Sequence, residues 1–155
     1  MGIKETFTND EWENLLRLPY AVSMTIIVAA PSALGLWGET KAMIQEPAIQ
    51  AAASGSGLVG LLLAEMQPKI KDVMIEQQNT WKHDQPGYKR TTLEACRSAA
   101  AALSKISPDE ALAYKKWVQA IGMRVAEAAK EYGVFVSVPE QGALDEISSA
   151  LGITA

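Results

Sequence analysis

The stretch PYAVSMTIIVAA, residues 19–30, decides how the rest of the chain must be arranged. From Tyr20 to Ala30 it carries no charge and is apolar on every side, which is typical of a helix that other helices surround. Proline is tolerated in the first turn of a helix, so we expect this central helix to begin at Pro19. The rest of the sequence then has to supply the helices that cover it.

Helical patterns lie on both sides of this run. Thr8 and Glu11 can each satisfy a free amide at a helix start, which predicts a helix just before the central one. Pro31 and the glycines that follow interrupt the pattern, and we expect Pro47 to kink or break a helix and Pro68 to bend one. The helices predicted in this half cover residues 8–18, 20–30, 39–53 and 58–79, with a turn at 54–57.

The second half has its own start and stop signals. Thr91 and Glu94 repeat the capping box, and Ser107-Pro108 combines a cap with a first-turn proline. Gly133 and Gly152 can end helices in the left-handed conformation. The helices predicted here cover residues 91–103, 107–132 and 139–151, with a short extended piece at 134–136. These patterns predict an all-α fold, a compact helical bundle of about seven helices.

Length and composition predict one domain over residues 1–155. The chain is 48% apolar and 21% charged, which is typical of a globular protein and not of a disordered one. Residues 80–90 have no periodicity and contain a Pro-Gly pair, so we expect them to form an internal loop that joins two halves.

Charge and the first residues favour a cytoplasmic protein. A net charge of −4 and a pI of about 5.0 argue against a basic face for nucleic acid. Residues 1–6 carry an acid and no apolar run, so we expect no secretory signal. The uncharged run 18–38 is long enough to cross a bilayer, but Pro31, Gly35 and the lack of a basic flank favour a buried helix followed by a turn. Membrane association stays a third option for function.

The sequence contains no recognisable catalytic, metal or cofactor site. Its one histidine, His83, and one cysteine, Cys96, cannot form a zinc cluster by themselves. A nucleophilic pair of the two is conceivable across space, but Cys96 lies on an apolar helix face and is interpreted as a core residue. Pairs of adjacent acids lie in first turns or on polar helix faces, where they stabilise the helix dipole. We therefore expect no enzyme and no cofactor.

The predicted loop mixes aromatic and basic side chains. Trp81, Tyr88, Lys89 and Arg90 could stack on a base or bind an anionic partner. The alternative is a solvated linker whose aromatic rings fold back onto the bundle.

The segment VAEAAKEYGVFVSVPEQGALDEISSALGI, residues 125–153, resembles the TerB-like (tellurite-resistance) helical family. That family pairs an Ala-rich helix and a short Gly-containing acidic loop with a helix ending in Leu-Gly-aliphatic. A fainter echo from Ile27 to Glu39 suggests a helix-loop-helix pseudo-repeat. The resemblance implies a compact helical domain associated with stress or tellurite resistance, whose acidic loops bind a divalent cation. Here only Glu39 and Glu140 occupy plausible acidic positions, so we expect no metal site.

Two classes of function follow. The first is a non-catalytic scaffold that binds a protein partner or a second copy of the chain, forming a homodimer, through apolar loop residues. These residues, which could instead close the core, are Leu34, Leu36, Trp37, Val134 and Phe135. The second is a pocket between helices for a small ligand or a reaction. Residues that could line it, or else fill the core, are Met24, Met43, Met66, Met74 and Trp117. An enclosed pocket with an inward polar group favours the second class.

Overall fold

The computed structural model describes residues 2–29, 35–128 and 138–153, with the backbone alone for residues 35–39. All regular structure within these ranges is helical, which confirms the predicted all-α class. The α-helices are α1 (Asn9–Ala29), α2 (Gly35–Ser54), α3 (Gly57–Met66), α4 (Ile70–His83), α5 (Gln85–Leu103), α6 (Pro108–Ala128) and α7 (Val138–Leu151). Two short 3₁₀ helices, η1 (Ile3–Thr6) and η2 (Gln67–Lys69), precede α1 and α4. The predicted extended piece at 134–136 and the stop at Gly133 lie outside the described residues.

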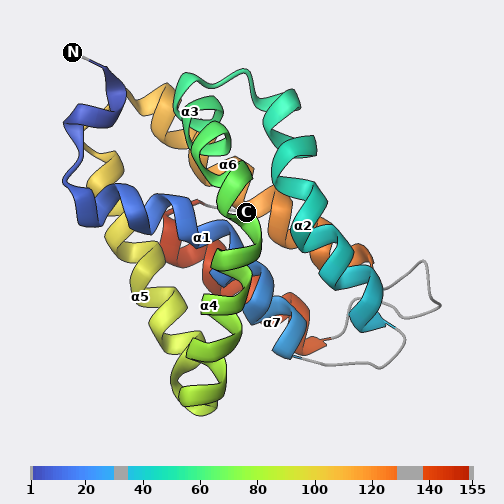
Figure 1. Cartoon of the computed structure of the whole chain (residues 1–155). Coiled ribbons are helices and arrows are strands. Elements are labelled where there is room, and N and C mark those ends of the chain that lie inside the picture. The colour runs from blue at the N-terminus through green and yellow to red at the C-terminus, as the bar shows by residue number, and fades with distance from the viewer. Residues whose placement is uncertain (1, 30–34, 129–137, 154–155) are drawn as a thin grey trace.

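Helix α1 runs through the middle of the molecule, as its apolar composition predicts. In Figure 1, α4 lies in front of α1, α6 and α7 lie behind it, and α2 and α5 lie on its two sides. Its side chains Leu15, Val22 and Ile26 have no exposed surface. None of the helices in the described ranges combines the length and the apolar character that crossing a bilayer requires.

The prediction that a new helix begins at Pro19 is wrong, because α1 continues through Pro19 without a break. Proline has no amide hydrogen, so the carbonyl of Leu15 loses its usual donor four residues on. The hydroxyl of Tyr114, on α6, donates to this carbonyl at 2.8 Å. Both residues are fully buried, where a carbonyl without a partner would cost about 1–3 kcal/mol. A hydrogen bond between two helices thus takes the place of the missing hydrogen bond within α1.

The segment from α2 to α4 folds largely as its turn residues predict. Gly55 takes a positive φ of 66° after α2, and the hydroxyl of Ser56 caps α3 by accepting from the amide of Val59. The prediction of one helix over 58–79 bent at Pro68 is wrong, because Pro68 lies in η2 and divides this stretch into α3 and α4. Pro47, in contrast, does not end α2, and its carbonyl accepts the indole hydrogen of Trp117.

The predicted loop at residues 80–90 is wrong. Helix α4 extends to His83 and α5 starts at Gln85, so Asp84 alone connects them. The backbone of Asp84 leaves the helical conformation, and its carboxylate caps α5 by accepting from the amide of Gly87 at 3.1 Å. Pro86 fits the first turn of α5, where no amide donor is needed. A proline and a glycine that suggested a loop therefore mark a helix start.

The remaining helix ends show which capping signals were reliable. Thr8 and Glu11 form the predicted capping box. The amide of Glu11 donates to the Thr8 hydroxyl oxygen at 3.1 Å, and the amide of Thr8 donates to the Glu11 carboxylate at 2.8 Å. Gly152 ends α7 with a positive φ of 79°. The second capping box is wrong, because Thr91 and Glu94 lie inside α5 and Asp84 caps that helix.

Candidate functional site

The apolar loop residues predicted to bind a partner cannot be placed as a surface. Leu34, Val134 and Phe135 lie outside the described residues. Leu36 and Trp37 belong to the first turn of α2, and their side chains lie outside the described part as well.

The aromatic and basic residues of the predicted loop do not form one exposed patch, because the loop is two helices. Tyr88 is buried, and its hydroxyl donates to Gln77 on α4. Lys89 forms an ion pair with Glu146 of α7 at 2.8 Å, and Arg90 is exposed. Trp81 is half-buried and packs against the core. The alternative, in which the aromatic rings pack back onto the bundle, describes Trp81 and Tyr88 better.

Cys96 is a core residue, as its apolar neighbours predict. It has no exposed surface, and burial raises the pKa of its thiol to about 12, so the thiol stays protonated at neutral pH. His83 is exposed at the end of α4. Cys96 lies in the core and His83 lies at the surface, so the two side chains do not form the conceivable nucleophilic pair.

The predicted helix-start carboxylates are engaged in structural contacts. Glu110, in the first turn of α6, accepts from the Ser56 hydroxyl at 2.6 Å and from two amides at the start of α3, which lowers its pKa. Hydrogen bonds from Lys105 and Thr8 likewise lower the pKa of Glu11. Among the described residues, no group of three or more His, Cys, Asp or Glu is placed to hold a metal ion. Glu140 is buried on α7, and the side chain of Glu39 lies outside the described part.

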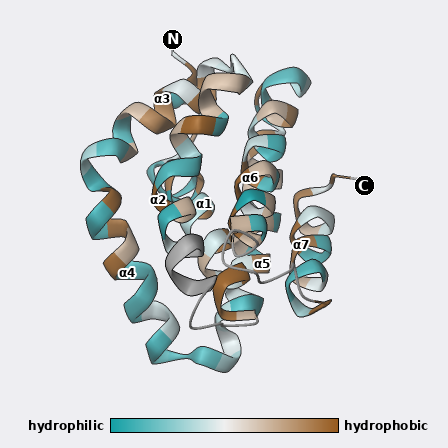
Figure 2. Cartoon of the chain, turned by 90° about the vertical axis from the view of Figure 1, so that its right-hand side faces the viewer, coloured by the Kyte–Doolittle hydropathy of each residue, from teal (hydrophilic) through white to brown (hydrophobic). Residues whose placement is uncertain are grey.

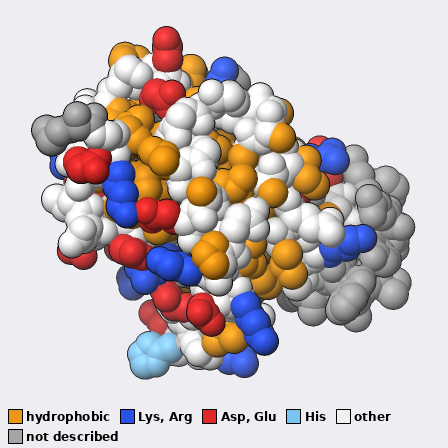
Figure 3. Space-filling view, turned by 45° about the horizontal axis from the view of Figure 1, so that its top comes forward, with side chains coloured by type: hydrophobic (Ala, Val, Ile, Leu, Met, Phe, Trp, Pro, Cys, Tyr) orange, Lys and Arg blue, Asp and Glu red, His pale blue; other side chains and the backbone are white. Residues whose placement is uncertain are grey.

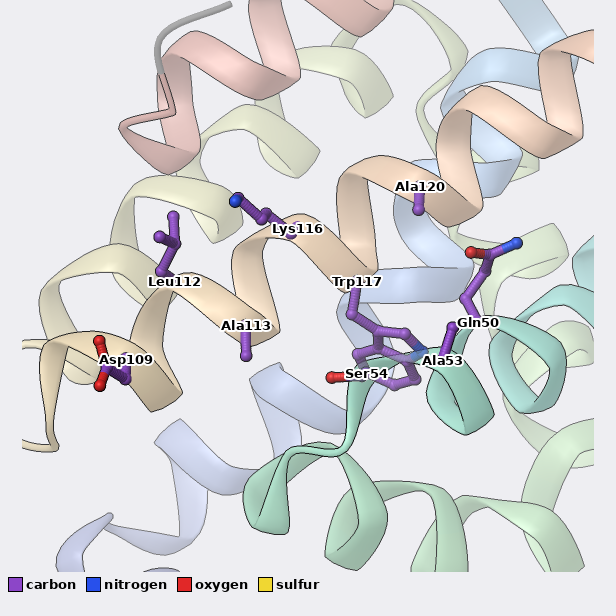
Figure 4. A pocket seen from close by; sticks show the side chains of 9 residues that line it. All are labelled: Gln50, Ala53, Ser54, Asp109, Leu112, Ala113, Lys116, Trp117 and Ala120. Atoms are coloured by element: carbon purple, nitrogen blue, oxygen red, sulfur yellow. The ribbon is translucent and has the colours of Figure 1, made fainter.

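One surface hollow, of about 400 Å³, lies between the end of α2 and helix α6 (Figure 4). Trp117 points from α6 towards Ala53 and Ser54 at the end of α2. Lys116 points away from α2, and Asp109 lies at the far end of the hollow. The polar side chains therefore do not converge on one point, and this hollow is a poor ligand site.

A second hollow is better built for a ligand and lies between α1, α2 and α4. Its volume is about 380 Å³, within the range of small-molecule pockets. We call it the methionine pocket. It is lined by Met24, Ile27 and Val28 of α1, Thr40 and Met43 of α2, and Met74, Gln78, Trp81 and Lys82 of α4.

The helix arrangement explains why this space is open. Helices α2 and α4 both pack on α1, but within the described part they do not pack against each other over any extended length. Helix α1 therefore forms the floor of the pocket, and the other two helices form its walls. Met24 and Ile27 on this floor are at most 7% exposed, and Met43 on the α2 wall is 1% exposed, so the floor and part of one wall belong to the core. Helix α4 carries both hydrophobic and hydrophilic residues along its length (Figure 2), and its polar residues in the pocket lining are Gln78 and Lys82.

The pocket offers apolar contact with a few polar groups at its edge. Thr40 and Gln78 can donate and accept hydrogen bonds, and Lys82 brings a positive charge. Methionine side chains are flexible and polarisable, so they can adapt to ligands of different shape. This arrangement suits binding of an apolar molecule.

Three of the five pocket residues suggested by the sequence lie together here: Met24, Met43 and Met74. Met66 is instead in the core, where its sulfur accepts the hydroxyl hydrogen of Tyr20 at 3.3 Å. Trp117 belongs to the other hollow.

Sequence reasoning missed Thr40, Gln78 and the role of Lys82 as pocket residues. Met74, Gln78 and Trp81 are spaced by four and three residues, which places them on one face of a helix. That signal was hidden because the loop was expected to begin at residue 80. Comparisons of the chain with protein-family models, with curated proteins and with solved structures found no match.

Proposed function

We propose that this protein acts by binding and not by catalysis, and that the methionine pocket takes a small apolar ligand. The observation that carries the proposal is an apolar hollow of about 380 Å³ whose floor is the central core helix. Filling it removes apolar surface from water, at about 25 cal/mol for each Å² buried. The structural engagement of Glu11 and Glu110 and the burial of Cys96 also support a non-catalytic role.

An uncharged apolar probe, octan-1-ol, tests this proposal directly. Isothermal titration calorimetry should detect saturable binding of octan-1-ol to the full chain. A ligand that binds only the folded state also raises the unfolding midpoint, so a thermal shift should accompany binding. Met74→Trp should abolish both signals, because a larger side chain at this half-buried wall position occupies the pocket.

The matched control is Leu61→Trp on α3. Leu61 is 47% exposed and lines none of the hollows described above, so this variant should bind octan-1-ol like the original chain. Circular dichroism should show equal helix content in both variants. Equal binding by the Met74→Trp variant, or no binding by the original chain, would overturn the proposal.

A protein partner or a homodimer remains a second candidate, which the large exposed side chains of α2 favour. Ile44 and Ile49 are 42% and 53% exposed on this helix. If α2 forms a homodimer contact, sedimentation equilibrium should give twice the mass of the chain, and Ile49→Lys should restore the monomer. A monomer at all concentrations would exclude the homodimer. The TerB-like resemblance, with its link to stress or tellurite resistance, stays a prediction.

A further inference from the structure

The methionine pocket continues into a second hollow along α4. This hollow has a volume of about 490 Å³ and shares Met74 and Gln78 with the pocket. Its remaining lining comes from the start of η2, the first half of α4 and one residue of α2: Gln67, Pro68, Ile70, Lys71, Ile75 and Ile44. The two hollows are therefore neighbours along α4, and we call the two together the α4 groove. Apolar side chains also reach the surface in the middle of the face seen in Figure 3.

One face of α4 lines the whole groove. Lys71, Met74, Gln78 and Lys82 follow each other at steps of three or four residues, so they form a single stripe along the helix. With a rise of 1.5 Å per residue, the two lysines lie about 16 Å apart along the helix. A ligand in the groove therefore meets apolar side chains between two positive charges.

The charge of the groove is opposite to that of the chain. The chain carries a net charge of −4, yet the charged side chains that line the groove are Lys71 and Lys82, and no carboxylate is among them. Within the described residues, neither lysine forms an ion pair. Lys4, Lys89 and Lys105 each pair with a glutamate at 2.5 to 2.8 Å. The groove thus presents free cations beside an apolar floor.

Of the two lysines, Lys82 is better placed for a ligand in the pocket. It lines the methionine pocket itself, whose floor residues Met24 and Ile27 are almost fully buried. A lysine at an apolar edge packs its methylene stem on the apolar surface and keeps its ammonium group in water. Thr40 and Gln78 lie in the same lining and can donate to a further acceptor oxygen.

We propose that the methionine pocket binds an aliphatic monocarboxylic acid of the fatty-acid type. The hydrocarbon chain lies against the methionines and Trp81, and the carboxylate lies at the rim beside Lys82. This inference rests on the proposed function, because it names the class of ligand for the same pocket. It adds one requirement, which is a negative charge at one end of the apolar molecule.

Sodium octanoate and octan-1-ol separate the two proposals, because they share a chain length and differ in charge. At neutral pH and low salt, calorimetry on the full chain should show octanoate binding roughly tenfold more tightly than octan-1-ol, as expected for a hydrogen bond to a charged group. Added salt should reduce the affinity for octanoate and leave that for octan-1-ol unchanged.

Variants of Lys82 sharpen the test. Lys82→Gln should remove the roughly tenfold preference for octanoate and keep the affinity for octan-1-ol, and Lys82→Arg should retain most of the preference. Lys116→Gln is the matched control, because it removes the same charge from α6 at a residue that points away from α2. It should bind both compounds like the original chain.

The outcomes are distinct. Two results would overturn the proposal of a fatty-acid ligand but not that of an apolar pocket. One is equal affinity for octanoate and octan-1-ol, and the other is an equal change of octanoate affinity in Lys82→Gln and Lys116→Gln. Absence of binding by both compounds would overturn the pocket as well.

Discussion

The two flanks of α1 show how one helix can be sealed on one side and open on the other. Towards α5, α6 and α7 its side chains are enclosed, and small residues such as Gly122 and Ala126 let neighbouring helices approach closely. Towards α2 and α4, Met24 and Ile27 face a hollow because these two helices do not meet over it. We therefore expect the sealed flank to contribute more to the stability of the fold than the open flank, which has the room that the proposed ligand needs.

Truncation of one side chain on each flank should show the largest difference between them in the free energy of unfolding. Ile121 on α6 is fully buried, so Ile121→Ala should lower the free energy of unfolding by about 2–5 kcal/mol, since it leaves a cavity. Met74 is only half-buried on the open flank, so Met74→Ala should cost about 1 kcal/mol. Urea denaturation measures both values. Equal costs would mean that the two flanks are packed alike.

A larger residue at Gly122 should also destabilise the sealed flank. A Cβ atom there would lie 3.2 Å from a methyl group of Leu144 and 3.2 Å from one of Val22. Gly122→Val therefore forces α1, α6 and α7 apart and should cost about 1–3 kcal/mol in urea denaturation.

Gly60, in α3, is the control for Gly122, because a side chain added there meets open space and not a neighbouring helix. A Cβ atom at this residue would have no neighbour within 4 Å, and the residue is exposed in α3. Gly60→Ala should stabilise the protein by up to about 1 kcal/mol through helix propensity alone. Stabilisation by Gly122→Val would contradict tight packing of the sealed flank.

The bond between Tyr114 and Leu15 can be isolated by a double-mutant cycle. Tyr114→Phe removes the donor and should cost about 1–3 kcal/mol, because the Leu15 carbonyl stays buried. Pro19→Ala restores an amide that can donate to the same carbonyl. In that background Tyr114→Phe should cost clearly less, as measured by chemical denaturation. An identical cost in both backgrounds would show that the hydroxyl does not replace the helical bond.

A small, pH-dependent effect concerns Glu110, at the contact between α6 and the start of α3. Glu110→Gln removes a charged acceptor and should cost about 1 kcal/mol at pH 7. The pKa of Glu110 is below its ordinary value of 4.5 in the folded state, so its contribution is complete above that value. As the pH falls through the folded pKa, the original chain loses this contribution and the variant does not. The difference between the two should therefore shrink in acid, and a difference independent of pH would contradict this origin.

Local signals in the sequence were sufficient for much of the fold. The uncharged run after Pro19 predicted the central helix, and the Thr8–Glu11 pair and Gly152 predicted helix ends that the structure confirms. These features depend on residues within a few positions of each other, so a local pattern contains the needed information.

The missed features depend on distant partners. Pro19 suggested a helix boundary, but its effect is offset by Tyr114, which lies 99 positions from the Leu15 carbonyl. Pro86 and Gly87 suggested a loop, but both lie in the first turn of α5. Asp84 caps that turn by accepting from the Gly87 amide. Methionines were suspected as pocket residues, but which of them share a hollow is set by the positions of α2 and α4 over α1.

The same distance of 99 positions has a consequence for biosynthesis. A nascent chain that ends before residue 114 contains the whole of α1. It does not yet contain the Tyr114 hydroxyl that donates a hydrogen bond to the Leu15 carbonyl. Ribosomes deliver the chain from its N-terminus at about 5–20 residues per second, so this segment waits several seconds for its partner. The Leu15 carbonyl, at the centre of the molecule, therefore gains its hydrogen-bond donor only after the chain has been made as far as α6.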